Sequence, residues 1–403
     1  MYYNKYQPVH QQNLTLIQYI FFKIIGLSPW TINNFGISRK CRKVSNVQND
    51  ICYLSYSGIF YNIMLFIGMV SLVLNFTFYQ TMHHETRTDN LVTAKTLTGF
   101  QFLASSEIMI LFAIYTFRQK VIIAVLNKLK SMDDKLQKCG VFGIDNDYTI
   151  HLIFTINFLL SCCFLITDSY HYPLLMILMR RSPAILYSWL IIQFTMLLDI
   201  IDKRFKILNS MIEKLSDIEN QSETLPSILK MPLLNELVIH KITDIKSAYV
   251  ELSEIGQKIT DFYGLFCLMA IKFIGTASIF VTYFLMMFFL GAIVLSTMVW
   301  LTNGIWLLWM TFQIIVFTTY VTRTMKQSNN TGKIINKFMD QSTMDEKVEK
   351  EMVKFLRNLP YLKIEFTACD VISIDRTLIG TFVGTIATYL IILIQFRLSP
   401  PSG

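Results

Sequence analysis

The sequence predicts an all-α, polytopic membrane protein with seven transmembrane helices, a cytoplasmic N-terminus and an extracellular C-terminus. Composition is the first reason, because the 403 residues are 53% hydrophobic and only 16% charged, with a mean hydropathy of +0.44. A soluble protein needs more charge than that to cover its surface. The second reason is that no charged residue lies between Asp50 and Glu85, or between Lys272 and Arg323. Each stretch exceeds the roughly 20 apolar residues that cross a bilayer.

Seven apolar stretches of suitable length predict the individual spans. They are residues 54–78, 97–117, 149–168, 182–200, 264–288, 299–322 and 375–397. The uncharged stretch that follows Lys272 is long enough for two of these spans with a short turn between them.

The distribution of Lys and Arg predicts the orientation. With the N-terminus inside, residues 1–51, 118–148, 201–263 and 323–374 face the cytoplasm and hold 29 of the 36 Lys and Arg residues. Positively charged loops remain on the cytoplasmic side of a membrane, so an odd number of spans places the C-terminus outside. A glycan on the sequon asparagines Asn220 or Asn329, sought by mass spectrometry of protein from animal cells, would contradict this orientation.

The segments between the spans divide the chain into six parts. They are a cytoplasmic N-terminal segment (1–51), spans 1 to 4 (52–200), a cytoplasmic helical segment (201–263), spans 5 and 6 (264–322), a second cytoplasmic helical segment (323–374), and span 7 with a short external tail (375–403). Helical spacing of apolar residues predicts that spans 4, 5 and 6 continue into the cytoplasm and pack together there. The apolar run Leu14–Ile25, which contains Gln18 and Lys23, predicts an amphipathic helix on the inner membrane surface.

Enzymatic and metal-binding motifs are absent from the sequence. The seven cysteines show no zinc spacing, and no HExxH, GxSxG or glycine-rich phosphate loop is present. We therefore expect no catalytic residue, metal or cofactor. The net charge of +8 fits cationic loops that meet anionic lipid, so we expect membrane lipid, and no nucleic acid, as a partner.

The last predicted span carries a stripe of uncharged polar residues. Thr377, Thr381, Thr385, Thr388 and Gln395 follow one another at steps of four, four, three and seven, which places them on one side of a helix. Beside them, Gly380 and Gly384 form a small-residue ridge suited to close helix contact. Such a stripe has two explanations, hydrogen bonding between helices or the lining of a hydrated path, and its spacing alone favours the first.

The end of this span resembles a family signature. Thr388-Tyr389, five apolar residues and Gln395-Phe396 are similar to the motif that closes insect gustatory receptors, and they stand in the same place. Length, seven spans, a cytoplasmic N-terminus and long helices between spans 4 and 7 agree with that family. The resemblance covers nearly the whole chain.

The resemblance implies a ligand-gated, non-selective cation channel in the plasma membrane of gustatory sensory neurons. The partners it implies are a small-molecule tastant and further subunits, either three copies of this chain in a homotetramer or other gustatory receptors in a heteromer. The last helix of each subunit would line the pore, so Thr381, Thr385 and Thr388 would form its wall. Gln395 and Phe396 would lie near the gate, where four Phe396 rings would form an apolar constriction.

The ligand pocket of the family opens outward among spans 2 to 6, which makes five residues candidates for binding. They are Glu107, Asp168, His171, Tyr283 and Trp306. Intramembrane charges are functional candidates, although Glu107 would equally serve as a structural partner for a hydroxyl or a lysine on a neighbouring helix. Asp168 and His171 would also fit an interfacial belt, and Trp306 would also fit packing between helices. Arg180 and Arg181 are expected on the external side, as lipid or ligand contacts or as a snorkelling pair.

The class of tastant is the least determined property. Sugar receptors of this family tend to carry an acidic residue directly after Thr-Tyr, where this chain has Leu390. We therefore expect a bitter or otherwise aversive compound, with a fructose-like sugar as the alternative. A G-protein-coupled receptor would place its N-terminus outside, and a secondary transporter would more often show internal repeats and broken helices.

Overall fold

The fold is a bundle of long helices, seen in a computed structural model that describes residues 9–32, 52–83, 91–138, 148–170, 174–222, 232–291, 297–341 and 346–398. The helices are α1 (Val9–Ile24), α2 (Tyr56–His83), α3 (Leu91–Lys138), α4 (Thr149–Ser169), α5 (Leu174–Ser222), α6 (Pro232–Phe289), α7 (Thr297–Gln341), α8 (Glu346–Asn358), the 3-10 helix η3 (Leu359–Leu362) and α9 (Thr377–Leu398). Two short antiparallel pairs complete it: β1 (Thr31–Ile32) with β2 (Cys52–Tyr53), and β3 (Thr367–Ala368) with β4 (Ile372–Ser373).

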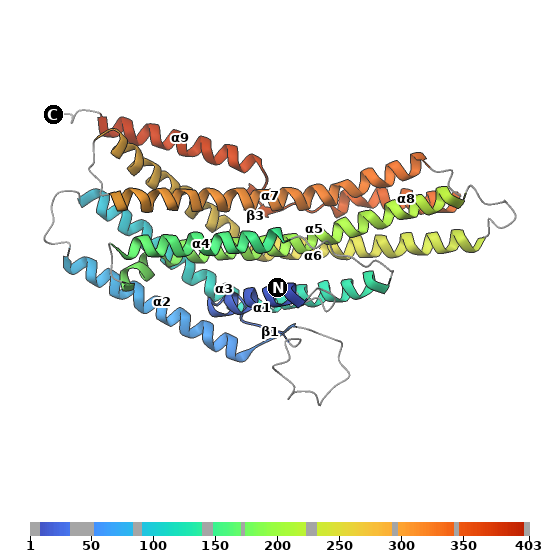
Figure 1. Ribbon diagram of the computed structural model, residues 1–403, viewed down its shortest axis with the longest axis horizontal. Coiled ribbons are helices and arrows are strands. Elements are labelled where there is room, and N and C mark those ends of the chain that lie inside the picture. The colour runs from blue at the N-terminus through green and yellow to red at the C-terminus, as the bar shows by residue number, and fades with distance from the viewer. Residues whose placement is uncertain are drawn as a thin grey trace.

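Seven of the described helices are long and apolar enough to cross a membrane, which confirms the predicted fold class. They are α2, α3, α4, α5, α6, α7 and α9, and each overlaps one predicted span. Four of them, α3, α5, α6 and α7, have 48, 49, 58 and 45 residues, well beyond the roughly 20 that a bilayer needs. Figure 1 shows α5, α6 and α7 running on past the transmembrane bundle toward α8. Which side of the membrane this end occupies remains a prediction from charge.

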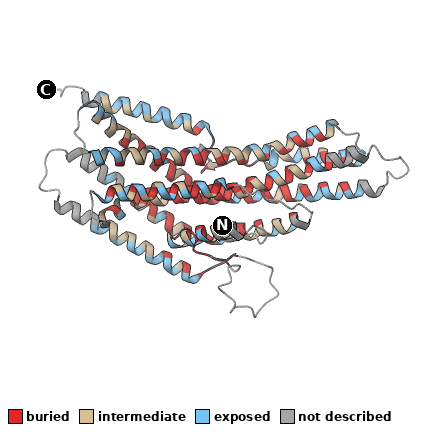
Figure 2. Ribbon diagram, in the orientation of Figure 1, coloured by how far each residue is buried: buried red, intermediate tan, exposed pale blue. Residues whose placement is uncertain are grey.

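Helix α5 forms the centre of the bundle. Within its most apolar window 83% of the residues are buried, and every residue from Tyr187 to Asp199 is buried. A helix that is apolar on all sides is stable only when other helices surround it, and α3, α4, α6 and α7 do so here. Figure 2 shows the buried residues gathered along these elements.

Helix α8 packs as its amphipathic pattern predicts. Val348, Met352 and Phe355 are buried on one face, while Glu349 and Lys350 are exposed on the other. The three apolar positions follow at steps of four and three, so they share one side of the helix. Burial of that side attaches α8 to α6 and α7.

The predicted amphipathic helix is present as α1, and it lies against the bundle. Phe21 meets the Trp189 ring of α5 with 4.3 Å between ring centroids, and Gln18 Nε2 lies 2.9 Å from His151 Nδ1 of α4. The opposite side, with Ile17, Ile20 and Ile24, remains exposed. Helix α1 thus has two apolar sides, one packed on the protein and one exposed, which the sequence pattern does not separate.

Replacing Gly58 by alanine is expected to destabilise the protein by about 1–3 kcal/mol, the usual cost of overpacking a well-packed site. An alanine Cβ at this position of α2 would lie 1.8 Å from the backbone oxygen of Pro29. The segment after α1 would have to move away, because a backbone carbonyl cannot turn aside as a side chain can. Thermal unfolding of detergent-purified protein measures the loss. Gly68→Ala on the same helix is the control, since its Cβ would meet nothing within 4 Å.

Candidate functional site

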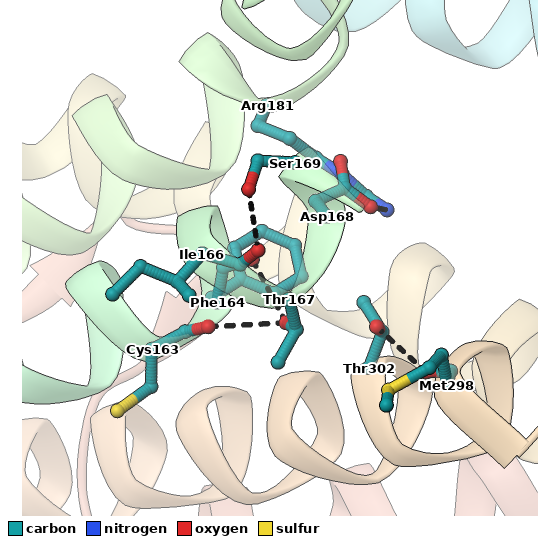
Figure 3. Close-up of polar contacts among 9 residues, drawn as sticks. All are labelled: Cys163, Phe164, Ile166, Thr167, Asp168, Ser169, Arg181, Met298 and Thr302. Carbon is teal, nitrogen blue, oxygen red and sulfur yellow. Dashed lines mark hydrogen bonds and ion pairs between the residues drawn. The ribbon is translucent and has the colours of Figure 1, made fainter. Parts of the chain in front are cut away.

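A buried ion pair joins α4 to α5 where the two helices meet. Arg181 donates from Nε to Asp168 Oδ2 at 2.8 Å and from Nη2 to Asp168 Oδ1 at 2.9 Å (Figure 3). The side chains are only 5% and 2% exposed. Two parallel bonds fix the planes of both groups, and the pair is electrically neutral as a unit.

The Arg181 guanidinium lies over two aromatic rings that also contact each other, with 5.6 Å between their centroids. Its Cζ lies 4.6 Å from the ring centroid of Phe164 and 4.7 Å from that of Trp306. Desolvated contacts of this kind stabilise a cation strongly. The Trp306 Nε1–H group is buried and has no hydrogen-bond acceptor among the described residues. A buried donor without an acceptor is costly, and a ligand oxygen would relieve that cost.

Asn157 connects the helices that carry this cluster. Its Oδ1 accepts from Trp309 Nε1 at 2.8 Å and from Ser188 Oγ at 2.8 Å, so one amide oxygen connects α4, α5 and α7. The Trp309 ring in turn lies 5.4 Å from Phe164. Since Trp309 is fully buried, it supports the cluster from within and Trp306, half-buried, forms its outer part.

A second ion pair within the membrane lies between α3 and α6. Glu107 pairs with Lys272, and Tyr187 of α5 donates a hydrogen bond to Glu107 Oε2 at 3.3 Å. Glu107 is buried, whereas the Lys272 side chain is 49% exposed. Tyr187 follows Arg181 by six residues, which is about 9 Å along a helix. The two α5 residues that contact the buried carboxylates, Arg181 and Tyr187, are therefore less than two helical turns apart.

The other two ligand candidates are not joined to this cluster in the described part of the chain. Tyr283 of α6 is half-buried and contacts its neighbour Phe284, with 5.9 Å between ring centroids. No described hydrogen bond or ring contact links it to Asp168 or Trp306. His171 lies outside the described residues.

The polar stripe of α9 is exposed in the single chain. Thr381, Thr385, Thr388 and Gln395 all lie on the surface, and Figure 2 shows that most of this helix is exposed. Only 6% of its most apolar window is buried. The Thr385 hydroxyl donates to the Thr381 carbonyl at 2.8 Å, and the Thr388 hydroxyl donates to the Gly384 carbonyl at 2.9 Å. Their hydrogens are thereby used within the helix, and oxygen lone pairs are left to point outward.

One side of α9 attaches it to the bundle. Leu378, Ile379 and Phe382 join the core, and a Cβ at Gly275 of α6 would lie 3.5 Å from the Phe382 ring. Gly380 and Gly384 would meet nothing within 4 Å if each carried a Cβ. Tyr389 is exposed, while the Phe396 side chain lies outside the described atoms. The signature residues Thr388, Tyr389 and Gln395 thus lie on α9, the least buried of the seven described helices that could cross a membrane.

The structure adds to two of the expectations from the sequence. Arg181 is 4% exposed and lies within α5, so its side chain is paired with Asp168 inside the bundle, while its place on the external side of the membrane stays a prediction. A buried counter-charge at the end of the preceding helix draws it inward. Glu107 has both kinds of structural partner predicted from the sequence, a hydroxyl on Tyr187 and a lysine, Lys272, on a neighbouring helix. Asn157, Phe164 and Tyr187 were not singled out from the sequence. The signal that could have revealed this cluster is the opposite charge of Asp168 and Arg181, which lie on either side of one short connection.

Comparisons with known proteins agree with this architecture. A family model of the 7tm chemosensory receptors matches residues 15–400. Putative gustatory receptor 28b of Drosophila melanogaster is 40% identical over 81 residues, 20% of this chain and 17% of that protein. Putative gustatory receptor 28a of the same species is 35% identical over 91 residues, 23% of this chain and 20% of that protein. The matched segments thus span about a fifth of each relative.

Solved structures with the same fold come from insect olfactory receptors. The olfactory receptor OR5 of Machilis hrabei covers 96% of this chain and 99% of its own, with a TM-score of 0.65 at 11% identity. The same receptor in complex with eugenol gives a TM-score of 0.60 at 13% identity. Identity this low shows a shared fold alone, whereas the family model spans nearly the whole sequence. The chain is therefore a membrane protein that belongs to the 7tm chemosensory receptor family.

Proposed function

We propose that this chain is a gustatory receptor subunit that forms a tetrameric, ligand-gated, non-selective cation channel in the plasma membrane of gustatory sensory neurons. One observation carries the proposal: among the seven described helices that could cross a membrane, the helix with the polar stripe, α9, is the one that the single chain buries least. A membrane helix with exposed polar groups needs partners or water on that side. Further subunits around a shared axis would supply both.

The chemistry of the stripe suits cations. Thr385 and Thr388 donate their hydroxyl hydrogens to carbonyls of their own helix. Four copies of the stripe would therefore surround the pore axis with oxygen lone pairs. Such oxygens replace part of the hydration shell of a cation and repel an anion. The expected position of Gln395 and Phe396 at the gate stays a proposal, with the Phe396 rings closing the path by excluding water.

The cluster around Arg181 is the proposed binding site for the tastant. Asp168 already neutralises Arg181, so the cluster has no net charge with which to select an acid. It offers the Trp306 indole face and an N–H donor that has no acceptor among the described residues. These groups suit a small, uncharged aromatic or heteroaromatic compound with an oxygen or nitrogen acceptor. Eugenol, bound by the olfactory receptor of similar fold, belongs to this class.

A bitter or aversive compound is the tastant that we propose, with a fructose-like sugar as the second candidate. Sugars are recognised through many hydrogen bonds, and acidic side chains often supply them. The carboxylates of Asp168 and Glu107 are both already paired, and Leu390 follows Thr-Tyr in the signature. These features favour an aromatic, less polar ligand.

Whole-cell recording from cells that express this chain alone tests the proposal. We expect plant alkaloids or phenolic compounds to evoke a cation current that reverses near 0 mV, because the pore does not discriminate among cations. Sugars in the same panel should evoke less. A current that disappears when G-protein signalling is blocked would overturn the channel, and so would ligand uptake without conductance. A response to fructose alone would overturn the assignment of the tastant and leave the channel standing.

A further inference from the structure

The hairpin of β3 and β4 connects η3 to α9 through a tight turn that exposes a cysteine. Val371 N donates to the Ala368 carbonyl at 3.1 Å, and the two residues between them, Cys369 and Asp370, have φ angles of +53° and +56°. Two successive residues in the left-handed region define a type I′ turn. Cys369 is exposed at this turn.

The same turn lies directly against α6. A Cβ on Gly264 would lie 3.2 Å from the backbone nitrogen of Cys369 and 3.8 Å from its Cα. The Thr367 carbonyl oxygen would lie 3.6 Å from that Cβ. The absence of a side chain at Gly264 therefore lets the backbone of the turn approach α6.

A second cysteine lies on the same face of α6. Cys267 follows Gly264 by three residues, and residues three apart on a helix are neighbours about 5–6 Å from each other. The Cα–Cβ bonds of a helix tilt toward its N-terminus, so the Cys267 side chain leans back toward Gly264 and the turn. Cys267 is 1% exposed.

We propose that Cys369 and Cys267 are an oxidation site at which a hydroperoxide forms a disulfide between the turn and α6. The exposed Cys369 thiolate attacks the peroxide O–O bond, which gives a sulfenic acid and releases hydroxide or alkoxide. The Cys267 thiol then attacks the Cys369 sulfur, the S–O bond breaks, and water leaves. Two thiols lose two hydrogens and two electrons, and the hydroperoxide is reduced to water and an alcohol, or to two waters if it is hydrogen peroxide. Redox-sensing cysteines are accessible to solvent and often lie next to a second cysteine that resolves the sulfenic acid.

The disulfide would tie the start of the proposed pore helix to α6. Only residues 374–376 separate β4 from α9, and Asp375 accepts a 2.8 Å hydrogen bond from the Thr377 N–H at the first turn of α9. A covalent bond at the turn would restrict movement of that end of α9 relative to α6. This consequence for gating rests on the proposed channel function, whereas the oxidation itself does not.

Mass spectrometry of the full-length protein tests the site independently of any current. Membranes from expressing cells are treated with hydrogen peroxide, remaining thiols are blocked with N-ethylmaleimide, and the digest is searched for a Cys267–Cys369 peptide that lacks the two thiol hydrogens. We expect that peptide, and we expect dithiothreitol to remove it. Cys369 oxidised to sulfinic acid or carrying the maleimide, with Cys267 still a free thiol after denaturation, would overturn the proposal.

Three variants make the result specific. Cys369→Gly removes the thiol and accepts the positive φ of the turn, so the fold is kept while the cross-link must vanish. Cys163→Ser removes an exposed free cysteine of α4 and should leave the cross-link unchanged. Gly264→Ala adds a methyl group against the turn and should lower the yield of cross-linked peptide several-fold. If Gly264→Ala left the yield as in the unaltered protein, contact at this position would not guide the reaction, and the proposal would fail.

In recordings, peroxide should then change the ligand-evoked current of the unaltered protein at least two-fold, and dithiothreitol should restore it. Cys369→Gly should abolish this effect while retaining the response to ligand. A cross-linked peptide without any change in current would overturn the effect on gating and leave the oxidation site intact. Absence of ligand-evoked current in the unaltered protein would instead contradict the proposed channel, whatever the peptide shows.

Discussion

Replacing Arg181 by alanine is expected to destabilise the folded protein by about 3–5 kcal/mol, because it leaves Asp168 charged, buried and without its partner. The change also removes the cation that lies over the rings of Phe164 and Trp306. That loss is a large fraction of the stability of a folded domain. Surface expression in cells and thermal unfolding in detergent measure it.

Two further variants test whether the loss of stability comes from breaking the buried ion pair or from removing any charged side chain. Lys128→Ala removes one partner of the Lys128–Glu254 pair, whose side chains are 30% and 55% exposed, and solvent-exposed pairs contribute about 0–1 kcal/mol. The double variant Asp168→Leu with Arg181→Met replaces the whole pair by apolar groups and should recover most of the stability. If the double variant is stable yet insensitive to tastant, the pair acts in binding as well as in folding. Equal loss from Arg181→Ala and Lys128→Ala would contradict the buried pair.

Introducing lysine at Thr385 is expected to lower the cation current at least about ten-fold with little effect on folding. Thr385 is exposed on α9, so the added side chain meets no obstacle within the single chain. In a tetramer it would place four positive charges around the pore. A cation about 4 Å from one ammonium group is repelled by about 4 kcal/mol at an effective dielectric constant of 20, and roughly 1.4 kcal/mol already changes a rate ten-fold. Whole-cell current normalised to surface expression checks the result.

Thr311→Lys is the matched control for this prediction. Thr311 is an exposed threonine on α7 whose hydroxyl also donates to the carbonyl four residues earlier, at 2.8 Å. The two variants therefore carry the same change in charge and in local hydrogen bonding. Thr385→Ser, which retains the outward oxygen, should conduct normally. If Thr311→Lys and Thr385→Lys lower the normalised current equally, α9 does not line the pore.

The sequence determined the features that depend on local composition and period. Low charge and high hydrophobicity are properties of each stretch by itself, so they predicted all seven spans, from residues 54–78 to residues 375–397, whatever their neighbours. The periods of α8 and α9 are equally local. They place Val348, Met352 and Phe355 on one side of α8, which the structure shows to be buried, and Thr381, Thr385 and Thr388 on one side of α9, which it shows to be exposed. Ends of helices were less accurate, since α5 begins at Leu174 and the predicted span at residue 182.

Tertiary structure alone decided which polar groups meet. Asp168 pairs with Arg181, and Glu107 pairs with Lys272, which is 165 residues away. Asn157 accepts hydrogen bonds from Ser188 and Trp309. Each contact depends on the rotation and depth of two or three helices relative to one another, and a helical period fixes only the faces of a single helix. The approach of Cys369 to Gly264 likewise requires the turn after η3 to fold back on α6. Sequence therefore determined that polar groups lie within the membrane, and the bundle determined which of them neutralise one another and which remain for a ligand or an ion.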